Sequence, residues 1–151
     1  MKPIIKYILI STCRFSITCC NTGYELKENE VLYKDWNEGG GYFYKSLSEV
    51  NIHSFKVLKH SSYAKDKNQA YYRGKLIKRA DAKTFQTIAD EYAVDGFSAF
   101  YQNKKIDSAD GRSFELLDNG PYGKDQNDYY YYQTKMNVSE VSSFKVLDES
   151  W

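Results

Sequence analysis

Hydrophobic residues recur at a fixed spacing along most of this chain. Four phenylalanines stand 29 or 30 residues apart, and each is followed three positions later by Leu or Ile: Phe55, Phe85, Phe114 and Phe144. The first and last of them lie in the same pentapeptide, Ser-Phe-Lys-Val-Leu, at residues 54–58 and 143–147. A period between about 20 and 50 residues is typical of an array of similar structural units. The pattern therefore predicts a repeat protein in which each unit packs on its neighbours.

A second motif recurs between these phenylalanines. The sequence Tyr-(Ala/Gly)-x-Asp begins at Tyr63, Tyr92 and Tyr122, and an aromatic pair stands eight and nine residues after each Tyr. Neighbouring residues of a strand point to opposite faces, so we expect the first member of each pair in the core and the second on the other face. The pairs are Tyr71-Tyr72, Phe100-Tyr101 and Tyr130-Tyr131, and a degenerate upstream copy contributes Phe43-Tyr44.

The copy at residues 61–91 indicates the local structure of one unit. Asp66-Lys67-Asn68 predicts a turn, because Asp and Asn hydrogen-bond the neighbouring backbone and tolerate unusual φ values. The segments 63–65 and 69–72 then form a hairpin, and a short strand follows a second turn at residues 73–75. Asp81 stands where its carboxylate can cap about one helical turn that carries Phe85.

These patterns predict a mainly β fold of β-hairpin repeats, about 29–30 residues each, with short helical turns; an α+β fold is the alternative. Residues 1–20 are expected to form a leader and residues 21–151 a single repeat domain. Trp36 and Trp151 stand near the two ends of the array and are candidate caps. The copies span approximately residues 30–60, which are degenerate, 61–91, 92–121 and 122–151.

The amino-acid sequence of the copy at residues 61–91 resembles that of a known family. Residues 63–75 read YAKDKNQAYYRGK and residues 80–85 read ADAKTF. This combination is similar to the DKNYY family of bacterial repeat proteins, and the resemblance covers roughly residues 60–147, with a degenerate extension back to about residue 30. The resemblance implies a bacterial protein that is often exported or lipid-anchored, and it brings no catalytic residues.

The first 20 residues differ from the rest of the chain. A basic start at Lys2 and Lys6 is followed by an apolar stretch, and the composition turns polar after Cys20. This arrangement resembles a bacterial secretory signal peptide, so we expect export to the periplasm, the outer membrane or the cell surface. Residues 17–19 before Cys20 resemble a lipoprotein cleavage site, which makes Cys20 the candidate for lipidation; Cys13 follows a second, weaker match. An ordinary cleaved signal and an uncleaved apolar N-terminus are the alternatives.

Charge and composition narrow the range of partners. The chain has 21 basic and 20 acidic residues, a formal net charge of +1, and 15 tyrosines. This balance creates no large field of one sign, so nucleic acid is not expected as a partner. Membrane contact is expected only through the lipid anchor.

No catalytic, metal or cofactor site is evident in the sequence. The only histidines are His53 and His60, and no cysteine after residue 20 can join them in a metal site. No Gly-x-Ser-x-Gly motif occurs. Aspartates recur in successive units, which favours turn and cap roles over a single catalytic carboxylate pair: Asp66, Asp95 and Asp125, and Asp81 and Asp110.

The second tyrosine of each pair is the candidate binding residue. Its favoured role is packing on the next repeat, and its alternative role is an aromatic platform for a sugar or a peptide. We expect a non-enzymatic exported repeat protein that presents a Tyr-rich surface to a protein or glycan at the cell envelope. A small hydrolase with an unrecognised site, and an immunity or inhibitor protein for a secreted toxin, are the alternatives. The candidate binding residues are Tyr44, Tyr72, Tyr101 and Tyr131.

Overall fold

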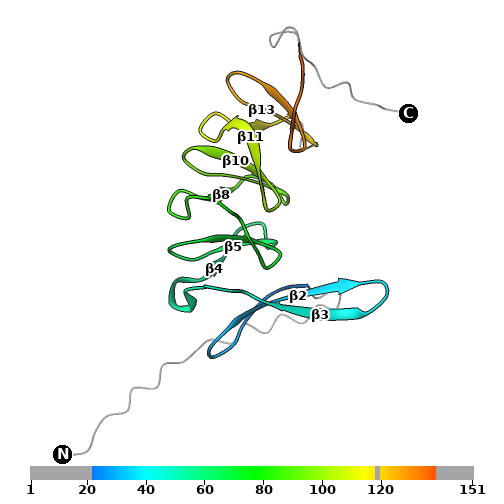
Figure 1. The fold of residues 1–151 in the computed structure, drawn as a ribbon, viewed down its shortest axis with the longest axis vertical. Helices are drawn as coiled ribbons and strands as arrows, with labels where there is room; N and C mark the ends of the chain where they lie inside the picture. The colour runs from blue at the N-terminus through cyan, green and yellow to red at the C-terminus, as the bar shows by residue number, and fades with distance from the viewer. Residues whose placement is uncertain (1–21, 118–119, 139–151) are drawn as a thin grey trace, which may run out of the picture.

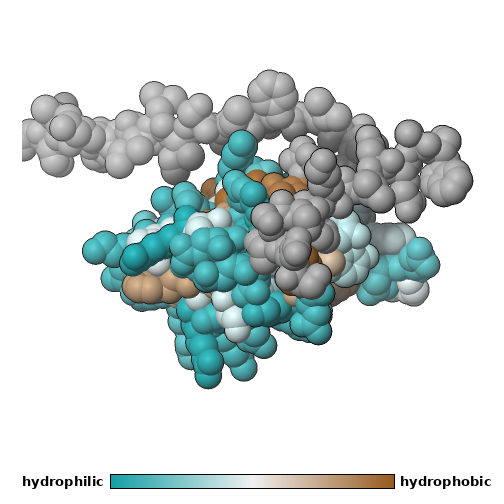
Figure 2. All heavy atoms as spheres, turned by 90° about the horizontal axis from the view of Figure 1, so that it is seen from above, coloured by the Kyte–Doolittle hydropathy of each residue, from teal (hydrophilic) through white to brown (hydrophobic). Residues whose placement is uncertain are grey.

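The computed structural model describes residues 22–117 and 120–138, and almost all of their regular structure is β. The chain forms four small antiparallel sheets that follow one another along the long axis of the molecule (Figure 1). The predicted mainly β fold of hairpin repeats is therefore confirmed. Seen along this axis, the described surface is largely hydrophilic, with small apolar areas (Figure 2).

The first sheet has three strands in the order β1–β2–β3, and each of the other sheets is a four-stranded meander. A single 3₁₀ turn, η1 (Ile52–Ser54), connects the first sheet to the second. The strands of the first sheet are β1 (Gly23–Leu26), β2 (Val31–Asn37) and β3 (Gly41–Ser46). Those of the second are β4 (Lys56–Val57), β5 (Tyr63–Lys65), β6 (Ala70–Tyr72) and β7 (Lys75–Leu76). Those of the third are β8 (Gln86–Thr87), β9 (Tyr92–Val94), β10 (Ser98–Tyr101) and β11 (Lys104–Asp110). Those of the fourth are β12 (Glu115–Leu116), β13 (Tyr122–Lys124), β14 (Tyr129–Tyr131) and β15 (Thr134–Lys135).

The sequence period is also the structural period. The first strands of the three meanders, β4, β8 and β12, begin 30 and 29 residues apart. Each begins directly after the recurring phenylalanine, so the first Ser-Phe-Lys-Val-Leu segment supplies β4. Sheets of two- to seven-residue strands bury too little surface to be stable alone, and stacking is what supplies the missing core.

The predicted hairpin is confirmed in detail. β5 pairs with β6 across the turn at Asp66, whose backbone N–H donates to the Gln69 carbonyl at 2.9 Å. The following turn has φ values of +47° at Arg73 and +74° at Gly74, the left-handed pair that suits a two-residue hairpin loop. The positions equivalent to Arg73 also have positive φ, although neither is Gly or Asn: Gln102 at +55° and Tyr132 at +52°.

The predicted capped turn is present as one hydrogen-bonded turn. The Asp81 carboxylate accepts from the Lys83 N–H at 3.1 Å and from the Thr84 hydroxyl at 2.6 Å. The Phe85 N–H donates to the Asp81 carbonyl at 2.9 Å, which closes the turn and directs Phe85 into the core. The corresponding turn before the second sheet is η1, capped by Asn51.

The hydrophobic core lies between successive sheets. The first member of each aromatic pair is buried as predicted: Tyr71 is 1% exposed, and Phe100 and Tyr130 are 0% exposed. Each of these rings packs with residues of the preceding sheet, so a repeat completes the core of its neighbour. The clusters group Tyr71 with Val31, Tyr33 and Leu47; Phe100 with Tyr63, Ala70, Tyr72, Ile77, Phe85 and Ala93; and Tyr130 with Tyr92, Val94, Ala99, Ile106, Ala109 and Phe114.

Trp36 does not cap the array. It is 51% exposed and stands opposite Tyr42 in the β2–β3 hairpin, which extends beyond the stacked sheets (Figure 1). The long hairpin carries the indole away from the core that a cap would cover. Trp151, Cys13 and Cys20 lie outside the described residues. No helix in the described part of the chain is long and apolar enough to cross a membrane.

Candidate functional site

The tyrosine that opens each repeat motif ties its repeat to the next one. The Tyr63 hydroxyl donates to the Glu91 carbonyl at 2.7 Å, and the Tyr92 hydroxyl donates to the Pro121 carbonyl at 2.9 Å. In the first sheet, the Tyr24 hydroxyl donates to the Ser62 carbonyl at 3.1 Å. These hydroxyl bonds fix the distance between repeats, and the sequence signal for them is Tyr rather than Phe at this position.

Each recurring aspartate joins the turn of its own hairpin to the capped turn 14 or 15 residues earlier in the chain. Asp95 is 4% exposed, and its Oδ1 accepts from the N–H groups of Phe97 and Ser98 at 2.8 and 2.7 Å. Its Oδ2 accepts from the Asp81 N–H at 2.8 Å. Asp66 and Asp125 make the same three kinds of contact, with Asn51 and Asp110 in place of Asp81. The predicted turn and cap roles of these aspartates are therefore present in the structure.

The four candidate tyrosines have different environments. Tyr72 is 6% exposed, and its ring lies 4.7 Å from the ring of Tyr63. Tyr101 is partly buried, with ring distances of 5.1 Å to Tyr92 and 5.2 Å to Tyr132. Tyr131 and Tyr44 are 44% and 51% exposed. Exposure thus rises from Tyr72 through Tyr101 to Tyr131, while Tyr44 in the first sheet is also exposed. A binding role for the four stays a prediction.

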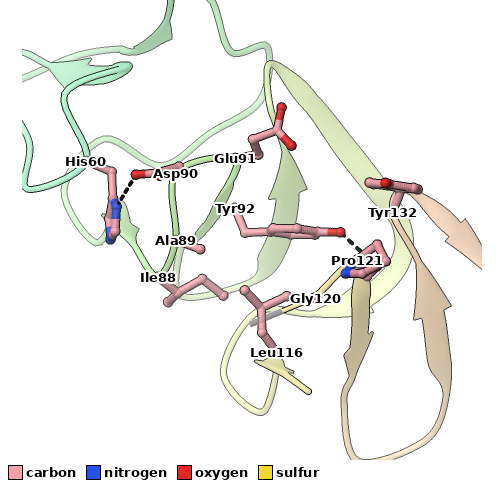
Figure 3. Close-up of a pocket in the computed structure, with 10 residues that line it drawn as sticks. All are labelled: His60, Ile88, Ala89, Asp90, Glu91, Tyr92, Leu116, Gly120, Pro121 and Tyr132. Carbon is pink, nitrogen blue, oxygen red and sulfur yellow. Dashed lines mark hydrogen bonds and ion pairs between the residues drawn. The ribbon is translucent and has the colours of Figure 1, made fainter. Parts of the chain in front are cut away.

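A cavity of about 420 Å³ lies between the third and fourth sheets, and none of the four candidate tyrosines lines it. The rings of Tyr101 and Tyr131 instead pack on Tyr132, at centroid distances of 5.2 and 4.6 Å. The apolar lining of the cavity consists of Ile88, Leu116 and Pro121, and the Tyr92 ring lies among these residues and also lines the cavity (Figure 3). Tyr132, which is 37% exposed, stands at its edge. The lining also includes the charged or basic side chains of His60, Asp90 and Glu91, together with Ala89 and Gly120.

The repeat itself brings His60 and Asp90 together. Residues 60 and 90 occupy equivalent turns, before β5 and before β9, and both turns close on the next tyrosine through its backbone N–H. Because equivalent turns stack, His60 Nδ1 comes within 2.7 Å of Asp90 Oδ1 (Figure 3). No metal or catalytic partner for His60 is predicted from the sequence, although the spacing of 30 residues between His60 and Asp90 is a signal for this contact.

Glu91 and its neighbours supply hydrogen-bonding groups at the edge of the cavity. Its carboxylate accepts from the Gln102 side-chain amide at 2.7 Å and from the Tyr101 hydroxyl at 3.3 Å. Partial burial, together with the negative charge of Glu91, raises the pKa of Tyr101. The Tyr101 hydroxyl therefore stays a donor at neutral pH. No group of three potential metal ligands occurs within residues 22–117 and 120–138.

A second aromatic surface lies on the β2–β3 hairpin. Trp36, Tyr42 and Tyr44 are each 50–51% exposed, and Trp36 stands directly opposite Tyr42. The alternation of side chains along the strands puts these three residues and Lys34 on one face, where the Lys34 ammonium lies 4.3 Å from the centre of the Tyr42 ring. The aromatic-pair pattern predicts Tyr44 as a binding residue but not Trp36 and Tyr42, although Tyr42 and Tyr44 alternate around Phe43.

The fold and these sites define a β-hairpin repeat protein whose units are joined by buried tyrosines and aspartates. The family model of the DKNYY family matches residues 3–104, and the chain belongs to this family. The match extends from residue 3 to the start of β11, further toward the N-terminus than the resemblance seen in the sequence. No curated protein and no solved structure matched the chain.

Proposed function

We propose that this chain is a non-enzymatic repeat protein that is exported to the bacterial envelope and anchored there by a lipid on Cys20. We further propose that it binds a glycan in the cavity between its third and fourth sheets. One observation carries the binding proposal: the cavity combines the exposed ring of Tyr132 and the apolar Pro121 with the carboxylates of Asp90 and Glu91. Sugars present both apolar C–H faces and hydroxyl groups, and a site with rings and hydrogen-bonding groups in one hollow complements both.

The recurring carboxylates support a non-enzymatic role. Both oxygens of Asp66, Asp95 and Asp125 are occupied by backbone N–H donors. A carboxylate held in this way stabilises a turn, whereas a general acid or base needs an oxygen free to exchange a proton with a substrate.

A protein partner is the second candidate, favoured by the face of Trp36, Tyr42 and Tyr44. Trp and Tyr are enriched at the centres of protein interfaces, and three large rings at 50–51% exposure are available for such contact. This surface lies on the first sheet, apart from the cavity, so mutation can separate the two candidates.

The glycan proposal is tested by calorimetric titration with chitin oligosaccharides, which are oligomers of N-acetylglucosamine. We expect saturable binding that weakens at least about fivefold, or ~1 kcal/mol, in Tyr132→Ala. The matched control is Phe97→Ala, which removes a ring that is 68% exposed on a hairpin tip, and it should bind like the wild type. An absence of wild-type binding, or equal weakening in both variants, contradicts the proposal.

Export and anchoring are tested on the full chain expressed in a bacterium. The basic start, the apolar stretch and the residues before Cys20 support a processed product that begins at Cys20 and fractionates with the envelope. Cys20→Ser should release the protein into a soluble fraction, whereas Cys13→Ser should not. An unprocessed chain in the cytoplasm contradicts both export and anchoring.

A further inference from the structure

A second hollow, of about 390 Å³, is lined mainly by basic residues. It lies where the turn after β7 meets the start of β11, so the second and third repeats both contribute to it. Four cations and one carboxylate give its lining a formal charge of +3, although the whole chain carries only +1. The charged residues are Lys78, Arg79, Lys104, Lys105 and Asp107.

No carboxylate of the described residues forms an ion pair with these cations. The ion pairs within residues 22–117 and 120–138 engage Lys45, His60, Arg73, Lys124 and Lys135. None of the four cations of the hollow forms an ion pair with a described residue, and all four side chains are exposed. Their charge is therefore available to a ligand.

The fold does not require two of these cations, Lys78 and Arg79. Features that build the repeat recur in each copy, as Asp66, Asp95 and Asp125 do. The residues equivalent to Lys78 and Arg79 are instead Asp107 and Ser108 in the next copy and Asn137 and Val138 in the last. Position 79 has φ +66°, and its equivalents Glu49 and Ser108 have +59° and +67°. The turn is thus structural, but the basic side chain on it belongs to one copy only.

The basic surface continues into an adjoining smaller hollow. That hollow has a volume of about 140 Å³, shares Asn103 with the larger one, and is lined by Arg73 and Lys75. Asp35 lies 2.7 Å from the Lys45 ammonium and 3.9 Å from the Arg73 guanidinium, so Arg73 is partly neutralised. Lys75 forms no ion pair with a described residue and extends the row of cations along the same side of two repeats.

We propose that this basic groove binds a linear ligand that carries adjacent phosphate groups. Guanidinium and ammonium groups bind phosphate through charge-assisted hydrogen bonds, and a row of cations from two repeats matches successive phosphates. A lining charge of +3 attracts an anionic ligand, whereas a neutral sugar gains no such attraction. A hollow suits a narrow chain better than a flat membrane surface, and the net charge of +1 limits recognition to local contacts.

The test uses the purified chain with inorganic polyphosphate as the probe. We expect binding that weakens as salt is raised, and at least a tenfold loss of affinity in the double variant Lys104→Gln, Lys105→Gln. The matched control, Lys59→Gln with Lys67→Gln, removes the same charge from exposed positions outside the groove and should bind like the wild type. Lys78→Gln with Arg79→Gln provides a second test on another element should the first variant fail to fold.

Three outcomes overturn the proposal. The first is that polyphosphate does not bind at low salt. The second is that the groove variants and the control variant lose affinity for polyphosphate equally. The third is that phosphatidylglycerol vesicles bind in place of polyphosphate and that the groove variants abolish this vesicle binding. Preferential binding of single-stranded DNA over polyphosphate, lost in the same variants, would assign the groove to nucleic acid instead. Tyr132→Ala should leave polyphosphate binding unchanged, so this proposal stands or falls independently of the glycan site.

Discussion

The hydroxyl of Tyr63 donates a hydrogen bond of 2.7 Å to the backbone carbonyl of Glu91, which lies in the next repeat. The same hydroxyl is 3.3 Å from the Gln102 carbonyl. Tyr63 is 0% exposed, so its hydroxyl finds its partners in the neighbouring repeat. A single buried oxygen thus helps to hold two units together, and the Tyr92–Pro121 bond repeats the arrangement one unit further on.

Tyr63→Phe is expected to lower the free energy of unfolding by about 1–2 kcal/mol, because it leaves the ring in place but removes the inter-repeat hydrogen bond. Urea denaturation measures the change. Tyr44→Phe is the control, since that ring is 51% exposed, and its effect should stay within about 0.5 kcal/mol. Equal effects of the two substitutions would mean that the Tyr63 hydroxyl does not stabilise the stack.

Alanine substitution of the second tyrosine should have a stability cost that declines from Tyr72 through Tyr101 to Tyr131. Tyr72 is 6% exposed, and Tyr72→Ala should cost about 3–5 kcal/mol because it leaves a cavity in the core. Tyr101→Ala should cost about half as much, since that ring is only partly buried. Tyr131→Ala, at 44% exposure, should cost less than about 1 kcal/mol. Thermal or urea melting of the three variants measures the order, and three equal costs would refute it.

Asp95→Ala should be among the most destabilising single substitutions, at about 3–5 kcal/mol. It removes the acceptor for three backbone N–H groups at 2.7–2.8 Å and leaves them in a buried site. Asp95→Asn keeps one oxygen and should cost less, although its amide places a donor beside another donor. Asp107→Ala, at an exposed position, is the control, and equal urea midpoints for Asp95→Ala and Asp107→Ala would contradict the role of Asp95.

Stability should fall as the pH rises above about 10, the usual pKa of a tyrosine. Burial raises the pKa of Tyr72 to about 12, and it also raises the pKa values of Tyr63, Tyr92 and Tyr130. Above pH ~10 the unfolded chain therefore binds fewer protons than the folded chain, so stability that is complete below this pH is lost progressively as the pH rises.

The measurement is tyrosinate absorbance followed together with circular dichroism during an alkaline titration. The buried tyrosines should ionise in the same transition that unfolds the sheets. Tyr72→Phe removes one titrating group and should reduce the loss of stability between pH ~10 and about 12. Ionisation of all tyrosines while the β signal is intact would contradict the prediction.

Local patterns in the sequence determined the repeat and its internal structure. The period of 29–30 residues, the turn at Asp66 and the burial of Tyr71, Phe100 and Tyr130 were predictable, because turn chemistry and side-chain alternation act between residues close together in the chain. The left-handed turns at Gln102 and Tyr132 were harder to predict, since neither residue signals positive φ as Gly does.

The tertiary structure alone decided how the repeats meet. Tyr72 and Tyr131 occupy equivalent positions, yet one is 6% and the other 44% exposed, because burial depends on which neighbouring unit covers the ring. The contact of His60 with Asp90 and the gathering of Lys78, Arg79 and Lys104 around one hollow also cross repeat boundaries. A period gives the number of residues between such groups, but the rotation and spacing of stacked units determine which of them come into contact.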